Sequence, residues 1–283
     1  MNSNDITIII NTFQSEDKIF HCLDSINSIY KVIIIENSNN IDFKNQLEKK
    51  YLNVKCFLTG ENLGYAKGNN FGLSKVTSKY ALILNPDTTL EDKTIKNFFI
   101  TAEKINDFAI IGPAKQDEFS DEDNNKECAQ VFPVHQLKGF AMFLNLDQFD
   151  EIGFFDSNFF IYLEEIDLCM RLKNHNKKIF LDKKIIINHL GGSSHNKSIN
   201  FEMELSRNWH WMWSTFYFNK KHYGYLNSLT QVSGKFFSSF IKMIFFTLIF
   251  KKKERKIYFQ RFSGLLNSIL GKKSWYRPKI LIN

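Results

Sequence analysis

Cysteine is scarce in this chain, and the few cysteines that occur are far apart. Cys22, Cys56, Cys128 and Cys169 form no C-x-x-C pair and have no metal-ligand spacing. Nothing in this pattern requires a disulfide, so we expect the protein to work in a reducing, cytosolic compartment.

Two kinds of apolar segment are also missing. The first five residues, M-N-S-N-D, lack the basic region and the apolar stretch of a secretory signal peptide. The apolar run at residues 236–250 is 15 residues long and is interrupted by Lys242. It is therefore shorter than the roughly 20 residues that span a bilayer. We expect the protein to stay on the cytoplasmic side of the membrane.

Acidic residues are almost missing from one part of the chain. Residues 205–283 contain 15 Lys or Arg and a single acid, Glu254, whereas residues 1–204 contain 22 bases and 29 acids. A basic tail attracts nucleic acid or anionic lipid by the same electrostatics, so charge alone does not choose between them. We expect a core domain at residues 1–200 and a helical extension at residues 201–283.

Strand and helix patterns alternate through the first third of the chain. Apolar runs rich in β-branched residues predict strands, and apolar residues at helical spacing lie between the first two runs. The predicted strands are residues 6–10, 32–35, 54–58 and 80–84, with later ones at 178–181 and 184–187. This order predicts an α/β fold with a doubly wound, mostly parallel, Rossmann-like sheet. Ligands of such sheets bind beyond the carboxyl ends of the strands.

Polar residues follow the first two predicted strands. Asn11, Thr12 and Phe13 come after the first strand, and Glu36 and Asn37 come after the second. A carboxylate such as Glu36 could accept the N3 proton of a uracil or thymine ring. The alternative is helix capping and turn formation by these Asn and Ser residues.

A glycine-containing loop leads into a predicted helix at residues 62–70. Its candidate donor-binding residues are Asn62, Gly64, Lys67 and Asn69. Glycine allows the backbone to approach a ligand closely, and a helix start can hold a diphosphate. The loop matches neither G-x-G-x-x-G nor a Walker sequence.

The fourth strand ends at a single carboxylate, in the sequence Asn85-Pro86-Asp87. Asp87 could bind a divalent cation that bridges two phosphates. The alternative is that Asp87 caps the helix expected at residues 92–105. Further along, His189 follows a strand and precedes glycines and Ser194, so it could bind a metal or a phosphate, or be an ordinary surface histidine.

Three carboxylates lie within four positions behind an aromatic run at residues 159–171. Glu164 and Glu165 fall in the first turn of a predicted helix, where the helix dipole favours negative charge. Buried carboxylates must be solvated, paired, metal-bound or catalytic, because an isolated buried charge is costly. The alternative is an ordinary helix start in which Asp167 pairs with Arg171.

Together these residues resemble the family 2 inverting glycosyltransferases of the GT-A fold, and in particular the bacterial rhamnosyltransferases. Eight blocks occur in the family's order, over about residues 5 to 196. They are Asn11-Thr12-Phe13, Glu36-Asn37-Ser38, Asn62-x-Gly64-Tyr65-x-x-Gly68-Asn69-Asn70, Asn85-Pro86-Asp87, Gly139-x-Ala141-Met142, Gly153-x-Phe155-Asp156, Phe159-Phe160-x-Tyr162-x-Glu164-Glu165-x-Asp167-Leu168-x-x-Arg171 and His189-x-x-Gly192-x-Ser194.

The resemblance implies a role for each block. Glu36 would bind the pyrimidine base, Asp87 and His189 would hold Mg²⁺ or Mn²⁺ against the donor diphosphate, and Ser194 would close over the phosphates. The general base would be Glu165, where the family usually has Asp. Acceptor binding would fall to Gly139, Phe140, Tyr162 and Glu164.

The implied activity is transfer of L-rhamnose from dTDP-rhamnose to a hydroxyl of a lipid-linked surface polysaccharide. Two alternatives are a UDP-sugar transferase, for galactofuranose, glucose or galactose, and a nucleotide-sugar-binding protein without turnover. A nucleic-acid binder is a further class, but the chain has no recognised nucleic-acid motif. No feature of the sequence indicates an oligomeric state.

The basic tail predicts a membrane contact. Residues 236–250 carry a polar stripe that includes Lys242, and a basic run at residues 251–256 follows them. This pattern is typical of an interfacial helix that rests on anionic lipid. We expect a peripheral protein on the inner face of the cell membrane.

Overall fold

The computed structural model describes residues 2–114, 130–189 and 197–279. Ser194, a predicted donor ligand, lies outside these ranges. The chain forms two compact units. The first contains Met1–Leu63, Lys67–Phe155 and Glu165–Asn196, and the second contains Gly64–Ala66, Asp156–Glu164 and Lys197–Asn283. The predicted division at residue 200 is close to the start of the last segment, but the second unit also includes two short segments from the predicted core domain.

The first unit is built on a mixed sheet whose strands run in the order β3-β2-β1-β4-β8-β6-β9-β5, with β7 also paired to β9. The four predicted early strands are all present. The strands are β1 (Ile6–Thr12), β2 (Lys31–Glu36), β3 (Val54–Leu58), β4 (Tyr80–Leu84), β5 (Thr88–Leu90), β6 (Ile110–Ala114), β7 (Val131–Pro133), β8 (Ala141–Asn145) and β9 (Ile179–His189).

The parallel part of the sheet aligns the strand ends that matter for the site. Strand β1 pairs in parallel with β2 and β4, and Thr12 lies opposite Glu36. Strand β8 runs antiparallel to β4 and begins where β4 ends, with Ala141 opposite Leu84. The carboxyl ends of β1, β2 and β4 and the start of β8 therefore share one rim of the sheet.

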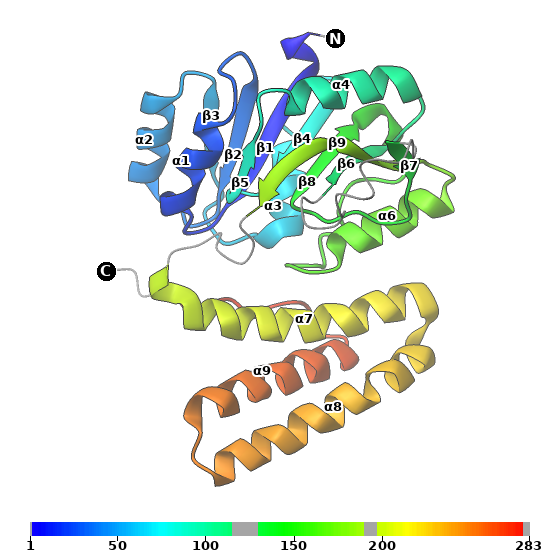
Figure 1. Cartoon of the computed structure of the whole chain (residues 1–283). Helices are drawn as coiled ribbons and strands as arrows, with labels where there is room; N and C mark the ends of the chain where they lie inside the picture. The colour runs from blue at the N-terminus through cyan, green and yellow to red at the C-terminus, as the bar shows by residue number, and fades with distance from the viewer. Residues whose placement is uncertain (1, 115–129, 190–196, 280–283) are drawn as a thin grey trace, which may run out of the picture. The chain divides into compact units, whose positions relative to one another are not determined.

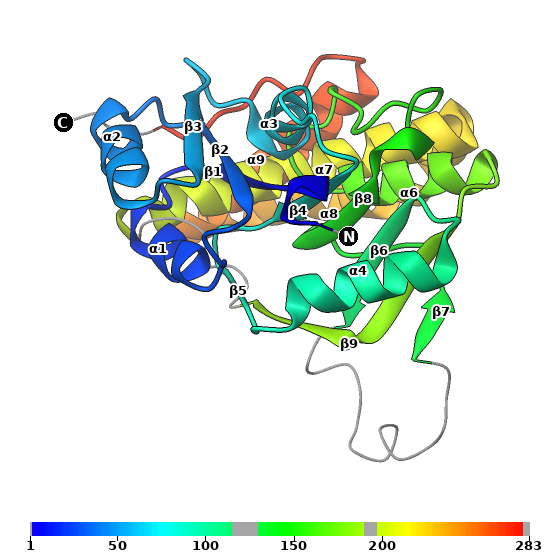
Figure 2. The ribbon, with the colours of Figure 1, turned by 90° about the horizontal axis from the view of Figure 1, so that it is seen from above.

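Helices cover both faces of the sheet (Figures 1 and 2). Side chains of α1, α2 and α4 form one apolar cluster with alternate residues of the strands, such as Ile8, Ile10 and Ile34. In Figure 2, α3 and α6 lie on the opposite side of the sheet from α1 and α4. The bounds are α1 (Glu16–Asp24), α2 (Ile41–Lys50), α3 (Gly64–Leu73), α4 (Thr94–Ile105) and α6 (Glu164–Asn174).

Two details of the sheet differ from the prediction. Strands β5, β7 and β8 run antiparallel to their neighbours, which no sequence pattern predicted. The two strands expected at residues 178–181 and 184–187 are one continuous strand, β9. The polar residues between them stay in the strand because Asp182 is buried and accepts a hydrogen bond from the Thr101 hydroxyl.

Helix α6 begins at Glu164, as its pattern predicts, and its Asp167–Arg171 ion pair is also confirmed. Asp167 is fully buried, and Arg171 Nε donates to its Oδ2 at 2.8 Å. The same guanidinium donates to the carbonyl oxygens of Ile152, Gly153 and Phe154. Arg171 therefore fixes the loop at residues 152–154 to α6.

The second unit contains three long helices. They are α7 (Asn200–Tyr223), α8 (Tyr225–Leu248) and α9 (Lys252–Ile269). Helix α9 packs on α7 at Gly264, where an added Cβ would come 3.0 Å from the Trp209 carbonyl carbon. Val232 of α8 packs with Met212, Phe216 and Leu265 in one apolar cluster. Among the helices that the structure describes, none combines the length and the apolar character needed to cross a membrane.

We predict that Arg171→Met lowers the free energy of unfolding by about 3 kcal/mol, because a fully buried carboxylate loses its ion-pair partner. Urea unfolding measures this loss. The matched control is Lys178→Met, which removes the exposed pair of Lys178 Nζ with Asp107 Oδ2 at 2.8 Å. The control should stay within about 1 kcal/mol of wild type. Equal losses in the two variants would contradict the structural role of Arg171.

Candidate active site

The pairing of β5 with β9 brings two predicted metal ligands together. Thr88 lies opposite His189 in this antiparallel pair, so Asp87, the residue before β5, reaches the end of β9. His189 Nε2 is 3.4 Å from Asp87 Oδ1. Two residues about 100 positions apart in the sequence therefore meet at the rim of the sheet.

The environment of Asp87 suits a cation. Asp87 is 4% exposed, and neither carboxylate oxygen accepts a hydrogen bond from any residue that the structure describes. A buried carboxylate in that state is costly, and a divalent cation would supply the missing partner. Carboxylate oxygen suits Mg²⁺ and Mn²⁺, and a neutral imidazole nitrogen is a common metal ligand. Within residues 2–114, 130–189 and 197–279, no three His, Cys, Asp or Glu side chains gather as a metal site.

Phe140 and Asn85 hold the His189 ring in place. The Phe140 ring stacks on His189 with 4.8 Å between centroids and 6° between planes. Asn85 Nδ2 is 3.5 Å from His189 Nε2, and Asn85 N–H donates to the Phe140 carbonyl at 2.9 Å. The imidazole is therefore oriented beside Asp87.

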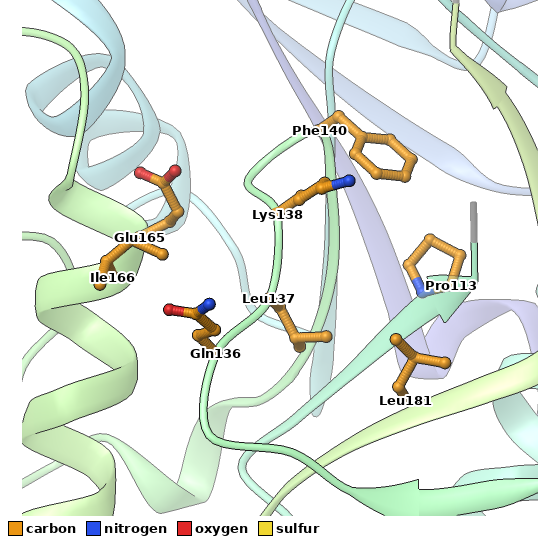
Figure 3. A pocket seen from close by; sticks show the side chains of 8 residues that line it. All are labelled: Pro113, Gln136, Leu137, Lys138, Phe140, Glu165, Ile166 and Leu181. Carbon is orange, nitrogen blue, oxygen red and sulfur yellow. The ribbon is translucent and has the colours of Figure 1, made fainter. Parts of the chain in front are cut away.

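The predicted base, Glu165, lines a pocket of about 160 Å³ in the first unit. Figure 3 shows Glu165 entering from the start of α6, opposite Phe140, Pro113 and Leu181, with residues 136–138 between them. Phe140 thus contacts His189 and also forms part of the pocket that contains the Glu165 carboxylate. The lining residues Gln136, Leu137 and Lys138 were not predicted as site residues, although they immediately precede the predicted acceptor residues Gly139 and Phe140.

Burial raises the pKa of the Glu165 carboxyl above its usual 4.5. The side chain has lost much of its water, which disfavours the charged form. A carboxylate with a raised pKa is a better proton acceptor near neutral pH than an exposed one. Glu165 therefore has the environment expected of a general base.

Asn37 joins the ends of β1 and β2 to the loop before α3. Its side-chain amide donates to Asn11 Oδ1 and to the Thr12 carbonyl, the latter at 3.1 Å. Its Oδ1 accepts from Leu63 N–H at 3.0 Å. Thr12 in turn donates to the Ile35 carbonyl at 3.2 Å. These predicted donor-binding residues are thus brought together, and in this structure they order the rim.

Glu36 is fully buried, and its oxygens accept hydrogen bonds from the backbone N–H groups of Ser38 and Asn40, each at 2.8 Å. Burial nevertheless raises the pKa of this carboxyl above its usual value. The structure thus contains a hydrogen-bonded turn after β2, which was the alternative prediction for this segment. Recognition of a pyrimidine base by Glu36 stays a prediction.

The start of α3 approaches β1 closely. A Cβ added at Gly68 would lie 2.8 Å from Asn11 Cγ, so only glycine fits without a shift of Asn11. Asn69 is fully buried, Lys67 is exposed, and Asn62 is half-buried. Of these residues, Lys67 is the one with a freely accessible side chain.

Four predicted residues remain to be placed. Phe13, in the first unit, is half-buried after β1. Gly64, Tyr162 and Glu164 belong to the second unit. Glu164 is 3% exposed, and the Tyr162 ring packs edge-on against Trp211 with 5.5 Å between centroids.

The sequence profile of Glycosyl transferase family 2 matches residues 7–170, more than half of the chain. This chain belongs to glycosyl transferase family 2. The matched range includes the rim of β1, β2 and β4 and ends inside α6, so it covers Asp87 and Glu165 but not His189.

Two curated relatives are similar over part of their length. The low-salt glycan biosynthesis hexosyltransferase Agl10 of Haloferax volcanii is 24% identical over 199 residues, which are 62% of this chain and 64% of that protein. The rhamnosyltransferase WbbL of Escherichia coli (strain K12) is 24% identical over 213 residues, with 59% of this chain and 76% of that protein covered. The chain thus matches just under two thirds of the first relative.

Solved structures share the fold at low identity. The mannosyltransferase PcManGT from Pyrobaculum calidifontis, in complex with GDP-Man and Mn²⁺, aligns with a TM-score of 0.60 and 10% identity, over 95% of this chain and 88% of its own. GalNAc-T7 with UDP, GalNAc and Mn²⁺ aligns with a TM-score of 0.56 and 12% identity, over 65% of this chain and 43% of its own. These likenesses establish a GT-A-like glycosyltransferase fold.

We predict that Gly68→Ala lowers the free energy of unfolding by about 1–3 kcal/mol, because the new methyl group must displace the Asn11 side chain from Asn37. Gly234→Ala is the matched control, since Gly234 also lies in a helix and has open space at its Cβ position. Alanine there should raise the free energy of unfolding by up to about 1 kcal/mol. Chemical denaturation measures whether each variant lowers or raises the free energy of unfolding. A stabilising Gly68→Ala would contradict the close approach of α3 to Asn11.

Proposed function

We propose that this protein is an inverting glycosyltransferase that moves a sugar from a nucleotide diphosphate donor to an acceptor hydroxyl. The observation that carries the proposal is that Phe140 contacts both parts of the candidate site. Its ring stacks on His189, which lies beside the buried Asp87, and it also lines the Glu165 pocket. A cation-binding pair and a poised base therefore adjoin one another in the first unit.

Glu165 is the proposed general base. A sugar hydroxyl that attacks an anomeric carbon must lose its proton as the new bond forms, and a positioned carboxylate accepts it, which typically contributes about 10²–10⁴-fold in rate. When a single base directs the attack from the side of the anomeric carbon opposite the leaving group, the configuration of that carbon is inverted. The proton ends on Glu165, and the leaving group departs as a nucleoside diphosphate.

Asp87 and His189 are the proposed ligands of Mg²⁺ or Mn²⁺. When bound, the ion would neutralise negative charge on the donor diphosphate. The proposal is supported by the two Asp87 oxygens, neither of which accepts a hydrogen bond from a described residue, and by the Mn²⁺ in the PcManGT and GalNAc-T7 structures. Phe140 and Asn85 would keep the imidazole oriented for this role.

The proposed donor is dTDP-rhamnose, and the proposed acceptor is a lipid-linked surface polysaccharide. The similarity to the rhamnosyltransferase WbbL supports rhamnose as the sugar. A UDP-sugar donor is the second candidate, since the hexosyltransferase Agl10 is similar at the same 24% identity and its name does not restrict the sugar to rhamnose. A thermal-shift screen of UDP, dTDP and GDP sugars, with and without Mn²⁺, separates them.

We predict that Glu165→Gln lowers kcat by about 10²–10⁴-fold and leaves donor binding unchanged, because the amide cannot accept the proton. In wild type, kcat should fall as the pH is lowered through a pKa above the usual 4.5, since burial favours the protonated acid. Initial rates across pH, with donor affinity by calorimetry, measure both effects.

Glu165→Asp is the control for this experiment, because it keeps the carboxylate and shortens its reach by one methylene. It should retain more activity than Glu165→Gln. Full activity in Glu165→Gln would contradict the base assignment. A wild-type protein that binds donors and transfers nothing would instead be a nucleotide-sugar-binding protein without turnover.

We further propose that α8 attaches the protein to an anionic membrane. One face of α8 is buried at Val232 and Ser239, whereas Phe237, Ile241 and Leu248 on its other side are 61%, 62% and 70% exposed. Phe250, after the helix, is 87% exposed. The basic run at residues 251–256 follows immediately, so apolar and positive groups lie together, as interfacial binding requires.

We predict that replacing Phe237, Ile241 and Leu248 by serine abolishes flotation with phosphatidylglycerol-containing vesicles. Each large apolar side chain that enters the interface contributes about 1.5–3 kcal/mol, so the triple variant should lose well over tenfold in affinity. The matched control replaces Ile29, Ile41 and Leu52 of the first unit by serine and should float as wild type does. These side chains are 60%, 52% and 99% exposed. Unchanged flotation of the α8 variant would contradict the proposal.

A further inference from the structure

Phe160 contacts two side chains from the C-terminal part of the second unit. The His210 ring of α7 stacks on it with 4.4 Å between centroids, and the Arg277 guanidinium carbon is 3.9 Å from its ring centroid. Phe160 is 7% exposed and His210 is fully buried. These contacts join a residue before α6 to a residue near the end of the described chain.

Residues 272–277, which we name the C-terminal strap, are fixed to α7. Burial lowers the pKa of His210 to about 3, so its ring is neutral at physiological pH. Its Nε2 is 2.9 Å from the Tyr276 carbonyl and its Nδ1 is 3.0 Å from the Ser274 hydroxyl. In the neutral ring, Nε2–H donates to Tyr276 and Nδ1 accepts from Ser274. These two hydrogen bonds fix the strap, and with it Arg277, to α7.

Phe160 also fixes the first turn of α3. Its carbonyl accepts a hydrogen bond from Tyr65 N–H at 2.7 Å. Gly64 has φ +74°, and an added Cβ there would come 2.8 Å from Phe160 Cε2. The backbone and the ring of Phe160 therefore both determine where α3 begins.

The segment after Phe160 needs support of its own. Tyr162 and Leu163 have φ of +77° and +68°, a region that bulky residues occupy only when the surroundings hold them there. Ser214 Oγ of α7 donates to the Ile161 carbonyl at 3.0 Å, and Trp211 packs on Tyr162. This strained turn leads directly into Glu164, the first residue of α6.

We propose that Arg277 is a positioning residue for the donor-binding end of α3. By its contact with Phe160, Arg277 keeps the Gly64–Tyr65 turn, the first turn of α3, in place. The identity of the ligand rests on the proposed function, whereas the mechanical link between Arg277 and α3 does not.

The experiment compares wild type with Arg277→Ala in the full-length chain. Hydrogen–deuterium exchange is followed in peptides that cover residues 64–73, because the Tyr65 amide is protected by Phe160. The expected result is faster exchange at the start of α3, together with a dissociation constant for dTDP or UDP, with Mn²⁺, that rises by about threefold to tenfold.

Arg261→Ala is the matched control, because Arg261 also lies over an aromatic ring of the second unit, at 5.7 Å from the Tyr258 centroid. It should leave exchange at residues 64–73 and nucleotide affinity as in wild type. Arg277→Lys keeps a cation over Phe160 and should restore part of both. This graded response separates positioning from a general loss of structure.

Unchanged exchange at residues 64–73 in Arg277→Ala would overturn the proposal. An equal rise of exchange along α7, α8 and α9 would also overturn it, since Arg277 would then stabilise the helices in general. A wild-type protein that binds no nucleotide would contradict the proposed function instead, and the exchange measurement would still decide the role of Arg277.

Discussion

The site depends on the antiparallel pairing of β5 with β9. This short ladder places Thr88 opposite His189, and it is the reason that Asp87 and His189 come within 3.4 Å of each other. The antiparallel start of β8 then delivers Phe140 to the same rim, because β8 begins where β4 ends. Without these two antiparallel strands, a purely parallel sheet would still lead to Asp87. It would lack His189, the second proposed cation ligand, and Phe140, which lines the Glu165 pocket. The antiparallel part of the sheet therefore places His189 and Phe140 at the site, which the parallel strands alone would not do.

Much of the parallel part of the sheet could be predicted from the sequence. Four apolar runs predicted β1 to β4, and the cluster at Glu164 predicted the start of α6 together with the Asp167–Arg171 pair. The antiparallel partners were not readable, because strand direction depends on long-range pairing rather than on local pattern. The continuity of β9 was not predicted, because polar residues lie in its middle. Asp182 there accepts a hydrogen bond from Thr101, a residue 81 positions away, and no local sequence pattern indicates such a distant partner.

The candidate donor residues show a second limit of sequence reasoning. Glu36 and Asn37 lie at the end of a strand, as binding residues do, yet both accept hydrogen bonds from backbone N–H groups, those of Ser38, Asn40 and Leu63. A polar residue at a strand end can bind a ligand or order the loop that binds it, and both roles call for the same amide or carboxylate. The ordering has a catalytic use, since groups that are already fixed need not be ordered when the donor arrives. The choice between the two roles depends on burial, which no motif contains.

The two functions proposed for the C-terminal part of the chain fall on separate residues. Its charge and apolar content predicted a tail that attaches the protein to lipid, and the exposed apolar side chains lie on the side of α8 opposite Val232 and Ser239 and just after the helix. The strap residues Ser274 and Tyr276 instead bind His210, and Arg277 covers Phe160. A deletion from residue 235 onward would remove both groups at once, so lost activity after such a deletion would say nothing about membrane attachment. Point substitutions can separate the two, because no strap residue belongs to the exposed face of α8.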